Sequence, residues 1–257
     1  MTIELLQFRF SPYNEKVRWA LDFKRVPHRR TSLLPGPHLR RVRALTGRTL
    51  TPVLVADGQA IDESARIVEW LDARWPEPAL CFADPARRTA CDAIVRRFDD
   101  DIAPRGRRAV LGTLLRTPGY MARVFGDGRP RWVQRAYALV LPLAAGAVRQ
   151  ANGIAGQASI DDGVAAFREG LDFVVRESAA TGFLVGERFS VADLTAASVL
   201  AVCVDPPDSP MTRPRPVAAP FAELLARYER HPGADWVRRI YREQRRSQRD
   251  FDGASPY

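Results

Sequence analysis

The stretch that decides how the chain is interpreted is residues 10–23, Phe-Ser-Pro-Tyr-Asn-Glu-Lys-Val-Arg-Trp-Ala-Leu-Asp-Phe. It follows the apolar run Ile3–Phe8, which predicts a strand. Pro12 suits the first turn of a helix, because its missing N–H would have no partner there. Ser11 then occupies the N-cap position, which serine prefers. The helix is predicted to turn one apolar face inward, made of Tyr13, Val17, Ala20 and Leu21.

Ser11 can be interpreted in two ways. A serine before a helix is most simply a cap for the first backbone N–H groups. The same position also lies beside unpaired N–H groups and the positive end of the helix dipole, which suit an anion or a thiolate. This stretch alone leaves both interpretations open.

Composition is that of a globular protein, with 46% hydrophobic and 27% charged residues in 257. That length allows one large domain or two modest ones. The net charge is +9, but Lys16 and Lys24 are the only lysines, and the arginines are scattered rather than gathered in a motif. We therefore expect a basic surface without specific nucleic-acid binding.

Three cysteines, Cys81, Cys91 and Cys203, form neither a CxxC pair nor a metal-binding pattern. So sparse and odd a number favours a reducing compartment. Strand-like sequence begins at Ile3 with no leader before it, and the apolar run Ala136–Val148 is too short to span a bilayer. We expect a cytoplasmic protein with no membrane span and no metal.

The first part of the chain predicts a small α/β domain that ends near Pro76. Strands alternate with helices up to Asp57-Gly58, which predicts a hairpin turn. Asp62-Glu63-Ser64 then opens a further helix. The predicted strands are 3–8, 28–34, 53–56 and 59–61, and the first two predicted helices are 12–25 and 38–45.

Beyond a linker at Trp75–Pro78, helical periodicity replaces strand patterns. Ser190–Asp193 reads as a capping box before a helix. The acidic run Asp99–Asp101 is interpreted as a solvated face rather than a metal site, because consecutive helical residues point in different directions. Helices are predicted at 84–115 with a break at Pro104, and at 131–152, 160–180, 194–204, 221–231 and 234–249, with loops at 117–130 and 205–220.

Three stretches together resemble the serine-type glutathione transferases. Ser-Pro-Tyr-Asn-Glu-Lys-Val-Arg at 11–18 resembles the active-site turn of that family, and Thr-Pro-Val-Leu at 51–54 with Asp-Glu-Ser at 62–64 resembles its glutathione-binding half. Residues 183–195, Phe-Leu-Val-Gly-Glu-Arg-Phe-Ser-Val-Ala-Asp-Leu-Thr, are similar to the signature of its helical domain. The resemblance implies a thioredoxin-like domain at 1–78, an all-α helical domain at 84–250, and a homodimer.

The resemblance also implies roles for single residues. Ser11 would donate a hydrogen bond to the sulfur of glutathione, the co-substrate, and stabilise its thiolate for transfer to a small hydrophobic electrophile. The backbone of Thr51, before a cis Pro52, would pair with the cysteinyl part. Ser64 would hold the γ-glutamyl carboxylate, and Glu63 would meet the γ-glutamyl ammonium group or support the thiolate.

One position departs from the family pattern. A basic residue usually stands shortly before the cis proline to bind the glycyl carboxylate, whereas this chain has Leu50. Arg48, Arg41 and Arg40 are the alternatives, and the sequence does not rank them. The electrophile pocket is equally open: Tyr13, Arg105, Arg108 and Tyr120 are candidates to line it, although helix-surface or core roles are the simpler interpretation of each.

Two other functions compete with conjugation. A glutathione-dependent thiol transferase needs a cysteine nucleophile, because only sulfur forms the mixed disulfide, and position 11 is serine. A non-catalytic binding or assembly module of the same fold is the other, since fold alone does not fix function.

Overall fold

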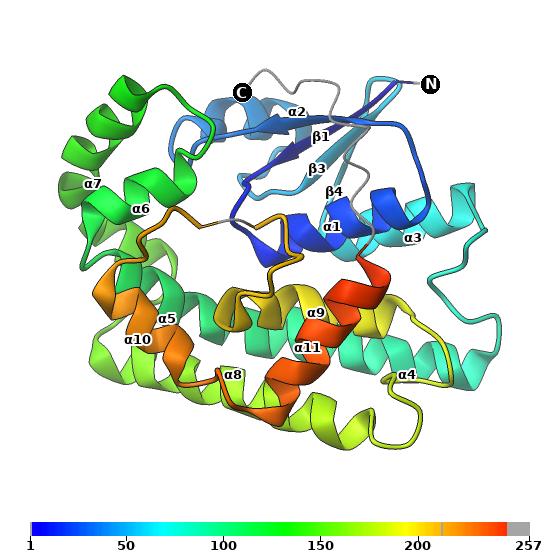
Figure 1. Cartoon of the computed structure of the whole chain (residues 1–257). Coiled ribbons are helices and arrows are strands. Elements are labelled where there is room, and N and C mark those ends of the chain that lie inside the picture. The colour runs from blue at the N-terminus through cyan, green and yellow to red at the C-terminus, as the bar shows by residue number, and fades with distance from the viewer. Residues whose placement is uncertain (1, 212, 246–257) are drawn as a thin grey trace.

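The computed structural model describes residues 2–211 and 213–245 (Figure 1). A mixed four-stranded sheet with three helices comes first, and a larger helical part follows. The strands are β1 (Ile3–Gln7), β2 (Arg29–Ser32), β3 (Val53–Ala56) and β4 (Gln59–Asp62), and the first helices are α1 (Pro12–Phe23), α2 (His38–Thr46) and α3 (Ser64–Arg74). This confirms the predicted α/β thioredoxin-like domain followed by helices.

The sheet has the strand order β2-β1-β3-β4, in which β1 and β2 are parallel and the other two pairs are antiparallel. Adjacent residues of a strand point to opposite faces. Leu5 therefore joins the core on the side of α1 and α3, whereas Leu6 packs with Val42 of α2 on the other face. The sheet is thus covered by helices on both sides.

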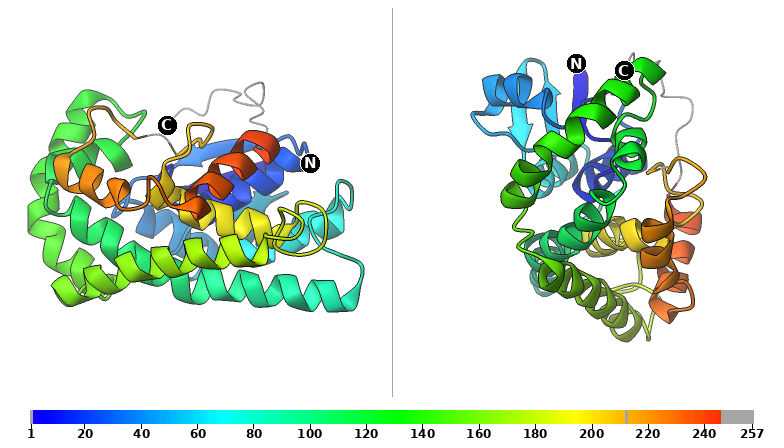
Figure 2. Two further views of the ribbon diagram at one scale, coloured as in Figure 1. Left: turned by 60° about the horizontal axis from the view of Figure 1, so that its bottom comes forward. Right: turned by 90° about the vertical axis from the view of Figure 1, so that its left-hand side faces the viewer.

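The later helices form the second part of the chain (Figures 1 and 2). They are α4 (Pro85–Arg96), η1 (Arg97–Ile102), α5 (Ala103–Leu114), α6 (Pro118–Phe125), α7 (Arg131–Ala151), α8 (Gln157–Glu177), α9 (Val191–Val204), α10 (Ala219–Ala226) and α11 (Pro232–Gln244). Helix α9 lies at the centre and all of its residues are buried. No helix in the described ranges has an apolar stretch long enough to cross a bilayer.

The capping box before α9 is present as predicted. Ser190 donates its backbone N–H to Oδ2 of Asp193 at 3.0 Å, and Leu184 donates its N–H to Oδ1 of the same carboxylate at 2.8 Å. Asp193 therefore ties the loop before α9 to the first turn of that helix. Because α9 packs against α1, this cap also supports the first domain.

Three helix predictions were wrong. The helix predicted at 221–231 is α10 (Ala219–Ala226), and residues 227–230 form a turn. Residues 118–125 form α6 rather than part of a loop, because Pro118 begins that helix and Gly126 follows its end. The chain is not broken at Pro104: the π-helix η1 runs directly into α5, and Pro104 is the second residue of α5.

The interpretation of Asp99 as part of a solvated face was also wrong. Its carboxylate accepts a hydrogen bond from Lys16 Nζ at 2.6 Å, and the Lys16 side chain is buried. Asp100 and Asp101 are exposed, as predicted.

Lys24 fixes the connection between the two parts. Its buried ammonium lies 2.6 Å from Oδ1 of Asp72 and donates to the carbonyls of Trp75 and Pro78, which belong to the predicted linker. The backbone between α3 and α4 is therefore held by a charge at the end of α1. The domain limits at residues 78 and 84 stay a prediction.

Candidate functional site

The strand register brings the predicted glutathione residues to one edge of the sheet. Leu6, near the end of β1, pairs with Val53 at the start of β3, and Val53 pairs with Asp62 at the end of β4. The segments that follow β1, precede β3 and follow β4 therefore meet at this edge. They carry Ser11, Thr51–Pro52 and Glu63–Ser64 respectively.

Ser11 is the N-cap residue of α1, as predicted, with an extended backbone and a half-buried side chain. Its carbonyl accepts the first helical hydrogen bond, from Glu15 N–H at 2.9 Å. Its hydroxyl makes no capping hydrogen bond. The hydroxyl thus lies beside the positive end of α1 without serving as a cap, and it is able to donate to a ligand.

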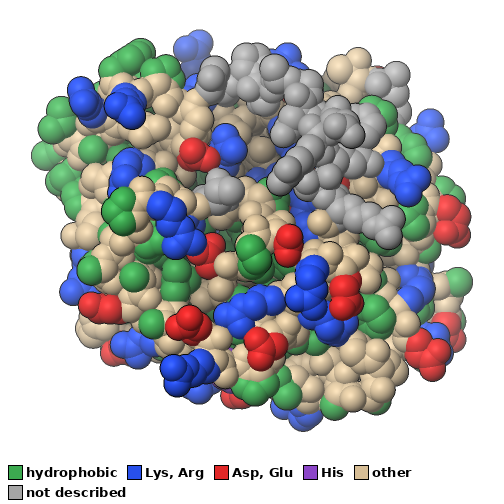
Figure 3. All heavy atoms as spheres, viewed as in Figure 1, with side chains coloured by type: hydrophobic (Ala, Val, Ile, Leu, Met, Phe, Trp, Pro, Cys, Tyr) green, Lys and Arg blue, Asp and Glu red, His purple; other side chains and the backbone are tan. Residues whose placement is uncertain are grey.

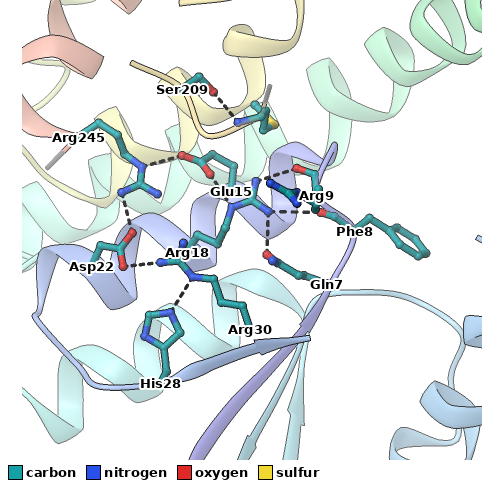
Figure 4. A network of polar contacts seen from close by, with 11 residues as sticks. Gln7, Phe8, Arg9, Glu15, Arg18, Asp22, His28, Arg30, Ser209 and Arg245 are labelled. Carbon is teal, nitrogen blue, oxygen red and sulfur yellow. Dashed lines mark hydrogen bonds and ion pairs between the residues drawn. The ribbon is translucent and has the colours of Figure 1, made fainter. Parts of the chain in front are cut away.

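A buried arginine holds the backbone that leads to Ser11 (Figure 4). Arg18 forms an ion pair with Glu15 at 2.7 Å and donates to the side chain of Gln7 at 2.7 Å. It also donates to the carbonyls of Phe8 and Arg9, at 3.4 and 3.0 Å. Burial lowers the pKa of Arg18 and the Glu15 carboxylate raises it, with a net lowering. The path from β1 to α1 is therefore rigid.

The second domain contacts the start of α1 through Asp99 of η1. Tyr13 donates its hydroxyl to the Asp99 carbonyl at 2.8 Å, and it accepts from Arg107 of α5 at 3.3 Å. The Arg107 guanidinium also lies 5.5 Å from the centre of the Tyr13 ring. Burial raises the pKa of Tyr13, although Arg107 opposes the shift. Tyr13 therefore connects the domains, and Arg107, which we did not predict, is the exposed cation of the second domain beside it.

The peptide bond between Thr51 and Pro52 is cis, as predicted from the resemblance. Thr51 is half-buried and its hydroxyl accepts a hydrogen bond from Asn14 Nδ2 at 3.1 Å. Asn14 belongs to the first turn of α1. The segment before β3 is thus tied directly to the helix that Ser11 begins.

Glu63 and Ser64 form the start of α3. Ser64 is buried, and Glu63 has a φ of 64°, a left-handed conformation that costs a non-glycine residue about 1 kcal/mol or more. Such outliers gather at binding sites. The Glu63 carboxylate forms an ion pair with Arg48, a contact that the sequence did not predict.

Three arginines were candidates to bind the glycyl carboxylate. Arg48 differs from the other two because it contacts Glu63 at this edge of the sheet. Arg41 pairs with Glu4 of β1 at 3.2 Å, away from this edge of the sheet. Arg40 is exposed on α2. Leu50 is also exposed, and its uncharged side chain cannot form an ion pair with a carboxylate.

His38 holds the loop that carries Arg48, a role that sequence reasoning missed. Its Nδ1 accepts from Gly36 N–H at 3.0 Å and its Nε2 lies 3.0 Å from the Thr49 carbonyl, so that Nε2 carries the proton. Burial lowers the pKa of His38 more than its hydrogen bonds raise it. The imidazole is neutral near pH 7 and therefore supplies no positive charge to the site.

The other candidates for the electrophile pocket, Arg105, Arg108 and Tyr120, make contacts within the second domain. Arg105 and Arg108 of α5 form ion pairs with Asp162 of α8, and Arg105 also pairs with Glu169. These contacts join two helices of the second domain. Tyr120 is buried in α6, where its ring packs near Phe221. Burial raises the pKa of Tyr120.

A groove of about 580 Å³ lies at the opposite end of α1 from Ser11. It is lined by Phe23 at the end of that helix, by the linker residues Glu77–Ala79, and by residues of the loop before α9. A helix of 12 residues is about 18 Å long, so the groove is separate from the edge that holds Ser11.

Comparison with known proteins gives two family matches. Residues 5–79 match the model "Glutathione S-transferase, N-terminal domain", and residues 157–242 match "Glutathione S-transferase, C-terminal domain". Maleylpyruvate isomerase from Ralstonia sp is 32% identical over 120 residues, which is 46% of this chain and 57% of that protein. The chain thus spans about half the length of the curated relatives it matches.

Solved structures support the same fold. A glutathione S-transferase from Rhodospirillum rubrum F11 has a TM-score of 0.58 at 21% identity, over 95% of this chain and all of the other. FzlA from C. crescentus has a TM-score of 0.57 at 21% identity, over 92% of both chains. Helices α4 to α7, with η1 among them, lie between the two matched family segments.

Proposed function

Because this chain belongs to the glutathione S-transferase family, we propose that it binds glutathione at the Ser11 edge of the sheet and transfers it to a small hydrophobic electrophile. The observation that carries the proposal is the convergence of Ser11, Thr51–Pro52 and Glu63–Ser64 through the strand register. The segments that carry a hydroxyl, a cis-proline turn and two helix starts therefore lie at the same edge of the sheet.

Ser11 would make the thiol of glutathione reactive. A free thiol has a pKa near 8.5, and each unit of lowering needs about 1.4 kcal/mol of thiolate stabilisation. One hydroxyl hydrogen bond to the sulfur and the N-terminus of α1 are of a size to supply about one to two units. The thiolate then attacks the electrophile and forms a carbon–sulfur bond while the leaving group departs with the electron pair.

The remaining groups would hold the peptide. The backbone of Thr51 would pair with the cysteinyl part, and the start of α3 at Ser64 would bind the γ-glutamyl carboxylate through N–H groups. Glu63 would meet the γ-glutamyl ammonium group. Arg48, beside Glu63, would bind the glycyl carboxylate in place of the residue missing at Leu50.

Replacing Ser11 by alanine tests the proposed thiolate role. With a chloronitrobenzene acceptor, we expect Ser11→Ala to lower kcat/KM by about ten- to a hundred-fold, because one to two pKa units of stabilisation are lost. The ultraviolet absorbance of the bound thiolate should titrate at higher pH in the variant. Tyr13→Phe is the matched control, because the Tyr13 hydroxyl is used by Asp99 and its loss should leave that titration in place. Equal rates for wild type and Ser11→Ala would show that the Ser11 hydroxyl takes no part in the reaction.

A glutathione-dependent isomerase is the second candidate, favoured by the 32% identity to maleylpyruvate isomerase. There the thiolate would add to a conjugated double bond, allow rotation, and leave again, so that glutathione is regenerated. Product analysis separates the two reactions. A stable thioether with stoichiometric loss of glutathione indicates transfer, and an isomerised substrate with glutathione unconsumed indicates isomerisation.

Calorimetry with glutathione tests the non-catalytic alternative. Binding heat at millimolar ligand supports an enzyme or a glutathione sensor, whereas no heat favours an assembly module that keeps only the fold. Ser11→Cys should create thiol transferase activity if the sulfur of glutathione meets position 11, and an inert variant would count against that placement. We further propose that the protein is a homodimer, which sedimentation of the purified protein would test, and that it is located in the cytoplasm.

A further inference from the structure

Helix α7 leaves an unusual amount of apolar surface uncovered. Eight large hydrophobic side chains are exposed in the described part of the chain, and four of them belong to this one helix. They are Trp132, Leu139, Val140 and Leu143, with exposed fractions of 72%, 78%, 54% and 88%. A single exposed leucine is ordinary, but a group of this kind on one helix marks an interaction surface.

The four side chains lie on one face of α7. At 3.6 residues per turn, Trp132, Leu139 and Leu143 fall on nearly the same line, with Val140 beside them. Leu141, on the opposite side, is the one buried residue of the 21 in this helix. Few contacts hold α7 to the rest of the protein: it packs mainly against α6, and Tyr137 donates to the Pro35 carbonyl at 3.2 Å.

The charged side chains of α7 all have one sign. Between Asp127 and Asp161 the sequence has no acidic residue, whereas Arg131, Arg135 and Arg149 stand on α7 itself. The helical period places these three arginines along one flank of the apolar stripe. Figure 3 shows hydrophobic side chains gathered over α6 and α7 at the upper left of the molecule, with basic side chains beside them.

We propose that the exposed face of α7 docks onto an anionic lipid bilayer surface, with the apolar stripe in the headgroup region and the arginines on lipid phosphates. An amphipathic helix of this length with tryptophan and leucine on one face and arginine along its flank is suited to such an interface. The positive charge of the α7 arginines favours an anionic bilayer over a second copy of the chain. A second copy packed symmetrically on α7 would bring arginines against arginines with no acid between them.

Vesicle flotation of the full-length protein tests this. We expect binding to phosphatidylcholine vesicles that contain phosphatidylglycerol, much weaker binding to phosphatidylcholine alone, and loss at high salt. The double variant Leu139→Ser/Leu143→Ser should bind at least ten-fold more weakly. Val175→Ser is its control, because Val175 is an exposed apolar residue of α8 outside this face. Arg135→Gln should weaken binding about five-fold, whereas Arg238→Gln on α11 should not.

Trp132 supplies a direct signal, because its emission should shift to shorter wavelength on vesicle binding and the shift should vanish in Trp132→Phe. Equal binding to both vesicle types, or none, would overturn the proposal. So would a change of sedimentation coefficient in Leu139→Ser/Leu143→Ser without vesicle binding by the wild type, since this face would then be a contact between copies. Turnover of a water-soluble substrate should be unchanged in these variants, so the outcome is independent of the proposed catalysis.

Discussion

We propose that Arg48 takes the part of the basic residue that is missing at position 50. It approaches the proposed glutathione edge from the loop after α2 and contacts Glu63, which starts α3 in a left-handed conformation. Both side chains are about half exposed, so the pair contributes little to stability. We therefore expect the Arg48–Glu63 pair to contribute to ligand binding rather than to stability.

Replacing Arg48 by alanine should raise the KM for glutathione about ten-fold with little change in kcat. A charge-assisted hydrogen bond to the glycyl carboxylate contributes about 1.5 kcal/mol or more, and the reacting sulfur lies elsewhere. Steady-state kinetics with varied glutathione measures this. Arg41→Ala is the matched control, since Arg41 pairs with Glu4. An unchanged KM in Arg48→Ala would remove Arg48 from the binding site.

Single residues were predictable where local chemistry decides. Ser11 at the N-cap followed from the local pattern of serine and proline before a helix, whereas the cis bond at Pro52 was implied by the family resemblance. Arg48 could not be ranked against Arg40 and Arg41, because the choice depends on where α2 ends in space. Arg107 lies 94 residues from Tyr13 in the sequence, and no local pattern joins them.

Among the elements, proline and glycine decided both the correct and the incorrect predictions. Gly47 ends α2 in a left-handed conformation, as a glycine after a helix should. The same residue types around α6 made residues 117–130 look like a loop. They instead mark the two ends of a short helix, with Pro118 at its start and Gly126 after its end. Composition alone does not distinguish these cases.

Two helical glycines should respond in opposite directions to alanine. A Cβ at Gly163 would lie 2.4 Å from the carbonyl oxygen of Arg105, where α8 crosses α5, so Gly163→Ala should destabilise the protein by about 2 kcal/mol or more. A Cβ at Gly146 of α7 meets nothing within 4 Å, so Gly146→Ala should stabilise the fold by about 0.5 kcal/mol. Urea unfolding measures both. A neutral Gly163→Ala would show that α5 and α8 can separate at little cost.

At the scale of the whole molecule, an ion pair of the first domain fixes the linker that leads to the second. Lys24 and Asp72 hold the linker, and Asp72 also accepts from the N–H groups of Leu80 and Cys81. Burial raises the pKa of Asp72, but Lys24 and these N–H groups outweigh it, so that the pKa is lowered overall. None of these contacts between distant residues could be inferred from the sequence, which indicated only that a linker lies there.

A carboxylate with a lowered pKa stabilises the fold above its ordinary pKa, and this contribution is lost as the pH falls through the lowered value. We therefore expect Asp72→Asn to reduce the free energy of unfolding by about 3 kcal/mol at pH 7, with the gap to wild type narrowing below about pH 4. Denaturant unfolding at both pH values measures it. Asp235→Asn, at an exposed ion pair, is the control and should change little. The same gap at pH 7 and pH 3 would contradict the charged role of Asp72.

The ion pairs of Arg245 have a consequence for synthesis of the protein. This arginine lies just after α11 and reaches back to Glu15 and Asp22 of α1, at 2.8 and 2.7 Å, with all three side chains buried (Figure 4). It leaves the ribosome 230 residues after Glu15. At usual rates of translation, that interval is on the order of 10 to 50 s. During this interval Glu15 and Asp22 of α1 lack their contacts with Arg245. The first domain is made first, but its set of ion pairs is complete only when the end of α11 has been made.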